Sequence, residues 1–267
     1  AYAKAAEALR EARRVMVRIG GGGREAGPEL GELLDLADAV AVTSPLVSGV
    51  IRHDHPRNMT VGGSKGSLCG NYAMESADFL VVVGSRSVCQ ADSSRTGYPL
   101  VEQVVNINAD PEDAMHYNKT VALVGDASLT LEKINEAMRA GRQQDIVGPS
   151  AWLKACCDKK REWSAFKAMR YQSPVLYDQI WDREVLTQPA AIKIATDWAR
   201  AQDAVCFFDA GDVQANGFQV VEDDRLGRTF TETGASYMGF AVSALLATAV
   251  STKPFYGLAL SGDGSFV

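Results

Sequence analysis

Residues 255–265 read FYGLALSGDGS and predict the end of a β-strand followed by a ligand-binding loop. The first six residues form a short apolar run of strand length, which Gly262 interrupts. In an open α/β sheet, ligands bind beyond the carboxyl ends of strands, where free backbone N–H groups can meet phosphates. The glycines permit close backbone approach, Asp263 can ligate a hard cation, and Ser265 can donate to a phosphate oxygen. The stretch therefore indicates a Mg²⁺-diphosphate site, although Gly-Asp-Gly also occurs in plain turns.

The composition is that of an ordinary globular protein, with 46% hydrophobic and 22% charged residues in a chain of 267. This length favours two domains, each with its own core. The net charge of −6 disfavours a nucleic-acid partner. No apolar run approaches the roughly 20 residues of a membrane span. The five cysteines lack metal-ligand spacing, which favours a reducing, cytoplasmic location.

Apolar runs of strand length alternate with helical segments over residues 1–140. A strand at Val15–Ile19 runs into the glycines at 20–23, and a helix then opens near Pro28. Because the glycines lack GxGxxG spacing, a tight turn without a ligand is as good an interpretation as a nucleotide site. The alternation predicts an α/β fold with a doubly wound, mostly parallel sheet. The other expected elements are strands at 39–42, Phe79–Val83, 104–107 and 121–124, and a helix over 127–139.

The same alternation restarts after a linker at residues 141–150. It predicts a second doubly wound, mostly parallel domain, which is incomplete. His53 and His55 lie in a segment that Pro56 makes a loop, and with no third ligand nearby a solvated polar loop is preferred to a metal site. The expected later elements are a charged helical stretch over 151–183, a helix from Gln188, a strand at Val205–Phe208, a loop over 229–239, a helix over 240–250 and the strand before Gly262.

Three features in this order resemble the thiamin-diphosphate enzymes of the acetolactate synthase and pyruvate decarboxylase superfamily. The first is the glycine-run domain, with Asp110-Pro111 at a strand end and Gly125-Asp126 as a helix cap. The second is a Gly-x-Met-Gly-like loop around Met238, and the third is the Gly-Asp-Gly-Ser motif. The resemblance implies residues 1–147 as a central, nucleotide-binding-like domain, 148–187 as a linker and helical segment, and 188–267 as the truncated N-terminal part of the diphosphate-binding domain.

The resemblance implies thiamin diphosphate and Mg as cofactors, with Asp263 as a metal ligand. Met238 would wedge under the cofactor and force its two rings into a V, unless it is a core methionine at a helix start. The V shape brings a nitrogen of one ring beside the carbon of the other that attacks a carbonyl. The implied cofactor-binding residues are Gly211, Asp212, Gln214, Ser236, Met238, Gly262, Asp263, Gly264 and Ser265.

Two acidic residues depart from the pattern of the synthases. Asp212 and Glu232 place negative charge near an anionic diphosphate, which is unfavourable unless they face the substrate or are paired or protonated. The central domain resembles one that carries FAD, an adenine nucleotide or nothing, and Lys65, Val88 and Gln90 depart from its FAD pattern. The implied nucleotide-binding residues are Gly21, Gly22, Gly23, Gly63, Gly66, Gly84, Arg86 and Asp126.

The resemblance predicts a fragment of a Mg-dependent, acetolactate-synthase-like enzyme that makes or breaks a C–C bond next to the carbonyl of a 2-keto acid. A non-oxidative 2-keto acid decarboxylase and a non-catalytic nucleotide-binding protein are the alternatives. An NAD-dependent dehydrogenase is disfavoured because the GxGxxG turn is missing. No catalytic residue is expected in this chain, since the activating Glu would lie in an upstream domain. The fragment is therefore expected to be inactive by itself, and the enzyme to be a homodimer or homotetramer without nucleic-acid or membrane partners.

Overall fold

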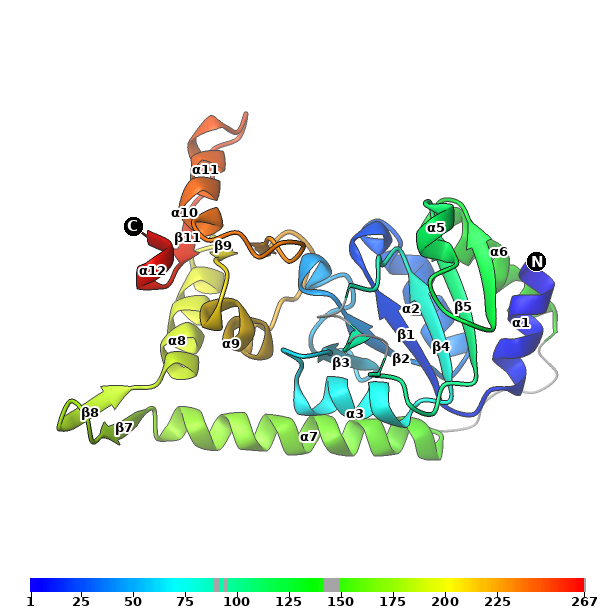
Figure 1. Cartoon of the computed structure of the whole chain (residues 1–267), viewed down its shortest axis with the longest axis horizontal. Coiled ribbons are helices and arrows are strands. Elements are labelled where there is room, and N and C mark those ends of the chain that lie inside the picture. The colour runs from blue at the N-terminus through cyan, green and yellow to red at the C-terminus, as the bar shows by residue number, and fades with distance from the viewer. Residues whose placement is uncertain (89–91, 94–95, 142–148, 267) are drawn as a thin grey trace.

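The computed structural model describes residues 1–88, 92–93, 96–141 and 149–266. Its larger part is a six-stranded sheet of order β3-β2-β1-β4-β5-β6, in which every pair is parallel (Figure 1). The chain order reverses at β1 and β4, as in a doubly wound fold. The predicted α/β architecture is therefore confirmed. The strands are β1 (Val15–Ile19), β2 (Val40–Thr43), β3 (Asn58–Val61), β4 (Phe79–Val83), β5 (Gln103–Asn108) and β6 (Thr120–Val124).

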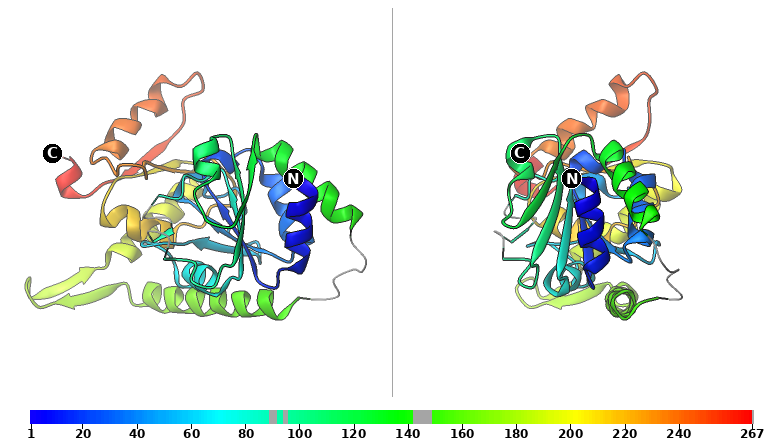
Figure 2. Two further views of the ribbon diagram at one scale, coloured as in Figure 1. Left: turned by 45° about the vertical axis from the view of Figure 1, so that its right-hand side comes forward. Right: turned by 90° about the vertical axis from the view of Figure 1, so that its right-hand side faces the viewer.

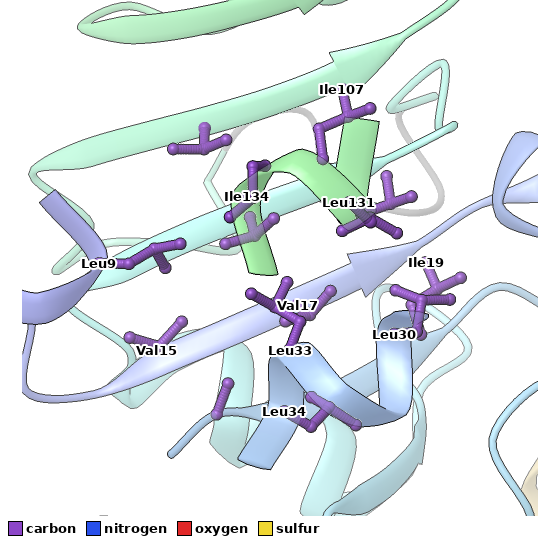
Figure 3. Close-up of a cluster of buried hydrophobic side chains, with 14 of the residues drawn as sticks. Leu9, Val15, Val17, Ile19, Leu30, Leu33, Leu34, Ile107, Leu131 and Ile134 are labelled. Atoms are coloured by element: carbon purple, nitrogen blue, oxygen red, sulfur yellow. The ribbon is translucent and has the colours of Figure 1, made fainter. Parts of the chain in front are cut away.

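Helices cover both faces of this sheet, because alternate residues of its central strands are apolar on both sides. Val15, Val17 and Ile19 face α1, α2 and α6, and Figure 3 shows these side chains interleaved with leucines of the helices. Met16 faces α3 and α7 on the other side. The helices are α1 (Tyr2–Glu11), α2 (Gly27–Leu36), α3 (Leu68–Ser76), α5 (Pro111–Ala114), α6 (Ala127–Ala140) and α7 (Ala151–Gln172), with short 3₁₀ turns η1 (Gly21–Gly23) and η2 (Pro45–Val47).

A second, three-stranded parallel sheet of order β10-β9-β11 forms the rest of the fold. Phe208 at the end of β9 is fully buried against α9 and anchors a separate core. In the described part of the chain, no helix is long and apolar enough to cross a membrane. The elements are α8 (Gln188–Ala201), β9 (Val205–Phe208), α9 (Asp212–Val220), β10 (Thr229–Thr231), α10 (Phe240–Ala244), α11 (Leu246–Val250), β11 (Gly257–Leu260) and α12 (Asp263–Phe266).

Several elements differ from the sequence predictions. The helix expected over 151–183 ends at Gln172, because Ser173 and Pro174 follow and proline cannot continue a helix. An antiparallel hairpin of β7 (Val175–Asp178) and β8 (Arg183–Leu186) comes next and projects from the end of α7 in Figure 1 and in the left view of Figure 2. Strands β3 and β10 were missed, since each is short and carries polar residues that read as loop. The expected linker falls mostly on residues 142–148, outside the described residues.

A partly buried ionic cluster joins the two sheets through α7 and α8. The carboxylate of Glu222 lies 3.3 Å from Lys167 Nζ, 3.7 Å from Lys193 Nζ and 3.8 Å from His53 Nε2. Burial would raise the pKa of Glu222, but the ammonium groups of Lys167 and Lys193 outweigh it and hold the pKa below its usual range. The predicted histidine loop is present, but it is partly buried rather than solvated, because Lys160 Nζ donates to its backbone carbonyls.

We expect acid to destabilise this cluster through His53. Burial and the Lys167 ammonium lower the pKa of His53 to about 4, whereas the unfolded chain titrates near 6.5. As the pH falls, His53 therefore takes up a proton in the unfolded chain before it does so in the folded chain. The stabilisation that neutral His53 gives the folded state is complete above pH 6.5 and is lost as the pH falls toward 4. The free energy of unfolding should fall by about 2 kcal/mol between pH 7 and pH 5 from this group. Urea unfolding at both pH values measures this fall in the free energy of unfolding, and His53→Gln should reduce it. An unchanged fall between pH 7 and pH 5 in that variant would contradict the assignment to His53.

Candidate functional site

The candidate site lies at the carboxyl ends of β9 and β11, which are neighbours in the three-stranded sheet. Phe208 pairs with Leu260, so the loops that follow these two residues leave the sheet at the same level. A third segment, residues 232–239, leads from β10 into α10 beside them. The edge at which parallel strands end is where ligands bind in open α/β sheets.

The carboxylate of Asp209 ties the three segments together. Its Oδ1 accepts hydrogen bonds from the backbone N–H groups of Ala210 at 2.8 Å and Gly239 at 3.0 Å. Its Oδ2 accepts from Ala241 N at 3.3 Å and from Ser261 Oγ at 3.1 Å. Asp209 is 0% exposed, so these four donors replace its hydration. The sequence analysis did not select Asp209; the available signal was a carboxylate directly after the apolar strand VCFF.

Met238 lies against the Gly-Asp-Gly-Ser motif. Its side chain is 65% exposed, so the alternative of a core methionine is wrong. The Met238 methyl carbon lies 3.5 Å from the position that a Cβ on Gly264 would occupy. A Cβ built on Gly239, which has φ +87°, would lie 3.6 Å from the carbonyl oxygen of Ser265. The structure thus brings together two segments that the sequence separates by more than twenty residues.

Open space borders the glycines of this edge. A Cβ added to Gly211 or to Gly262 would meet no atom within 4 Å. Asp263 is exposed at the start of α12, where its Oδ1 accepts the N–H of Gly264 at 2.9 Å. No group of three or more His, Cys, Asp or Glu residues in the described ranges could hold a metal. A single carboxylate suits Mg²⁺, which commonly takes one or two carboxylates and completes its shell with phosphate oxygens and waters.

Ser236 carries two unusual features beside Met238. Its φ of +56° is left-handed, a conformation that costs energy for a residue with a side chain. Its Oγ is buried and has no hydrogen-bond partner among the described residues. An orphaned buried hydroxyl at a strained backbone position fits a site that a polar ligand completes.

The two acidic departures have different surroundings. Glu232 accepts hydrogen bonds from the backbone N–H groups of Gly234, Ala235 and Tyr237. Partial burial would raise the pKa of Glu232, but these N–H groups outweigh it and hold the pKa below its usual value. Glu232 is therefore ionised and paired within its own loop. Asp212 is exposed in the first turn of α9, where the helix dipole favours a negative charge.

Gln214 is buried beneath the loop, with its side-chain amide directed toward the central sheet. Its Nε2 donates to Thr231 Oγ1 at 2.7 Å and to the carbonyl of Glu232 at 2.8 Å. Its Oε1 accepts from Lys65 Nζ at 3.1 Å. Of the predicted cofactor-binding residues, Gln214 is thus the one whose side chain already links the two sheets.

The glycine run of the central sheet is explained by backbone packing. Gly22 N donates to Gly84 O at 2.9 Å, and a Cβ on Gly22 would lie 2.9 Å from Gly84 Cα. Gly84 has φ +57°. The tight-turn interpretation therefore suffices for these glycines, and the nucleotide site stays a prediction. The other residues predicted for the nucleotide site also have structural contacts. Gly63 N donates to Asn71 Oδ1, a Cβ on Gly66 would strike Asn71, and Asp126 caps α6. Arg86 is exposed near Gly234, and Gln90, which departs from the FAD pattern, lies outside the described residues.

Replacing Asp209 with Asn should destabilise this edge. The amide would present an NH₂ group to N–H or O–H donors and leave at least one buried donor unpaired. We expect a loss of about 2–4 kcal/mol in the free energy of unfolding. Asp212→Asn is the matched control, since that exposed carboxylate should cost less than about 1 kcal/mol. Chemical unfolding of both variants measures the difference, and equal losses would show that Asp209 does not hold the loops.

Comparison with known proteins gives one family and several relatives. Residues 2–134, about half of the chain, match the family described as thiamine pyrophosphate enzyme, central domain. The chain is 24% identical over 258 residues to acetolactate synthase 2, chloroplastic, of Zea mays, covering 96% of this chain and 38% of the relative. It is 25% identical over 267 residues to the acetolactate synthase isozyme 2 large subunit of Escherichia coli (strain K12), covering 99% and 45%. The chain thus spans less than half the length of these relatives.

Proposed function

Because this chain belongs to the thiamin-diphosphate enzyme superfamily, we propose that it binds thiamin diphosphate and Mg²⁺ at the carboxyl ends of β9 and β11. The observation that carries the proposal is the approach of the exposed Met238 methyl to Gly264, the residue that follows the exposed carboxylate of Asp263. Three features lie together here: the exposed apolar side chain of Met238, the carboxylate of Asp263 and glycines that border open space. A cofactor with rings and a diphosphate needs an apolar surface for the rings, an oxygen ligand for its metal and room for the diphosphate.

The residues of the edge fit different parts of this cofactor. Asp263 would ligate Mg²⁺, and the glycines at 211 and 262 would allow the diphosphate to approach the backbone. Met238 would contact the rings, and Ser236 would gain a partner for its orphaned hydroxyl. Asp209 would bind nothing itself and would hold the three loops in position.

The reaction that we propose is the making of a C–C bond next to the carbonyl of a 2-keto acid. Its support is that the matched relatives are acetolactate synthases and that they match 96–99% of this chain. When bound, thiamin diphosphate supplies a nucleophilic carbon for attack on such a carbonyl. This chain would contribute the diphosphate and metal contacts, within a homo-oligomer of cytoplasmic location.

Calorimetric titration with thiamin diphosphate, with and without Mg²⁺, tests the cofactor assignment. We expect binding that strengthens with Mg²⁺, since the cation screens the diphosphate from the acidic residues nearby. Asp263→Asn should weaken binding at least tenfold in Mg²⁺ and change it little without Mg²⁺. Asp224→Asn is the control and should retain the Mg²⁺ effect, since this exposed carboxylate precedes β10 and lies at the opposite end of the strands. If Mg²⁺ changes nothing in the unmodified chain, the assignment is wrong.

Shortening Met238 should affect the cofactor and spare the fold. Its exposed side chain supports little of the core, so Met238→Ala should change the free energy of unfolding by less than about 0.5 kcal/mol. The same variant should weaken thiamin diphosphate binding severalfold, whereas Met238→Leu, of similar volume, should bind nearly as well as the unmodified chain. A variant that loses stability and keeps its affinity would place Met238 in the structural core instead.

A further inference from the structure

A small cavity lies between the two sheets, away from Met238 and Asp263. Its volume is about 60 Å³. The central, six-stranded sheet contributes the end of β1 and the loops after β2 and β3. The part of the chain around the three-stranded sheet, here called the second unit, contributes α9 and the loop after β10. The lining includes Arg18, Ser44, Lys65, Gln214, Phe218 and Thr233.

Arg18 brings a buried positive charge to this cavity without an anionic partner. It is 2% exposed, in a strand whose other residues are all apolar. Its Nη1 donates to the carbonyl of Gly62 at 3.4 Å, and its Nε has no hydrogen-bond partner. Within the described ranges, no carboxylate forms an ion pair with it. An isolated buried charge is strongly unfavourable, so its presence requires an explanation.

Lys65 adds a second cation with a neutral partner. Its Nζ donates to Gln214 Oε1, and it has no ion pair within the described part of the chain. Asp92, a buried carboxylate on the same side of the sheet, accepts from Tyr117 OH at 3.0 Å and lies 3.3 Å from His116 Nε2, so it is engaged elsewhere. The lining therefore carries two positive charges and no carboxylate.

We propose that Arg18 and Lys65 bind one small oxyanion, a phosphoryl or a carboxylate group, in this cavity. The guanidinium offers N–H donors spaced for two oxygens, and the ammonium in the same lining adds a point charge. The volume suits a group of this size and lies far below the roughly 300 Å³ at which pockets begin to hold drug-sized ligands, which favours a small anion over a flavin or a purine.

The position of the cavity gives the anion a structural consequence. Lys65 reaches the second unit through Gln214, and Gln214 holds the loop that leads to Met238. An anion between Arg18 and Lys65 would add charged contacts across the same junction. The proposed anion site does not depend on the cofactor assignment, because none of its described contacts involves Met238 or Asp263.

Thermal unfolding of the 267-residue chain in phosphate, acetate or chloride, at one ionic strength and pH, tests the proposal. At a tenfold excess over the dissociation constant, the bound anion should raise the unfolding midpoint by about 3–6 °C over chloride. A rise in phosphate alone identifies a phosphoryl group, and a rise in acetate alone identifies a carboxylate. A rise in both identifies an oxyanion site without selectivity, and no rise in either overturns the proposal.

The variant Arg18→Met separates a binding role from a structural one. Methionine keeps an unbranched apolar stem and removes the unpaired charge, so the midpoint in chloride should rise while the anion effect disappears. Exposed Arg13→Met is the control and should keep the full effect. Should Arg18→Met fail to fold, Arg18→Lys retains the charge without the paired donors, and calorimetry should show at least tenfold weaker anion binding. An anion effect that persists in both Arg18 variants overturns the proposal, as does a rise produced by FAD or ADP and not by phosphate.

Discussion

The buried carboxylate of Asp209 is the interaction on which the candidate site depends. Four donors from three segments converge on its two oxygens, so one buried side chain links all three segments. A carboxylate can accept this many hydrogen bonds in one place, whereas an amide or a hydroxyl cannot. Removing the charge from water is costly, and the converging donors offset that cost. Met238, Gly264 and Asp263 are close to one another because Asp209 sets the distance between their loops.

In the central sheet, direct contact between two backbone segments plays a comparable structural role. The loops after β1 and β4 touch at Gly22 and Gly84 without any side chain between them. This close contact between Gly22 and Gly84 lets β1 and β4 end at the same level, with their loops packed directly against each other. The glycines are thus necessary for the fold, and a ligand is not required to account for them.

The sequence predicted the strongly periodic parts of the fold well. Runs such as FLVVV at β4 are apolar throughout because helices cover both faces of the sheet, and their glycine and aspartate ends mark the turns. It failed at β3, β10 and the β7–β8 hairpin, whose residues are polar or exposed and whose pairing is set by partners distant in the chain. Asp209 and Arg18 were missed for a related reason. Their roles arise from atoms that only the folded chain brings near them.

The acidic departures show how one local change can be absorbed without losing the architecture. Glu232 would repel a diphosphate if its carboxylate faced the open edge. Its oxygens instead accept the N–H groups of residues 234–237, so the loop that ends at Met238 closes around its own anion. Those N–H groups are then engaged and unable to bind a ligand, so the phosphate contacts of the proposed site would come from the glycines of the neighbouring loops. A loop stabilised from within in this way can hold the Met238 side chain beside Gly264 without help from a ligand.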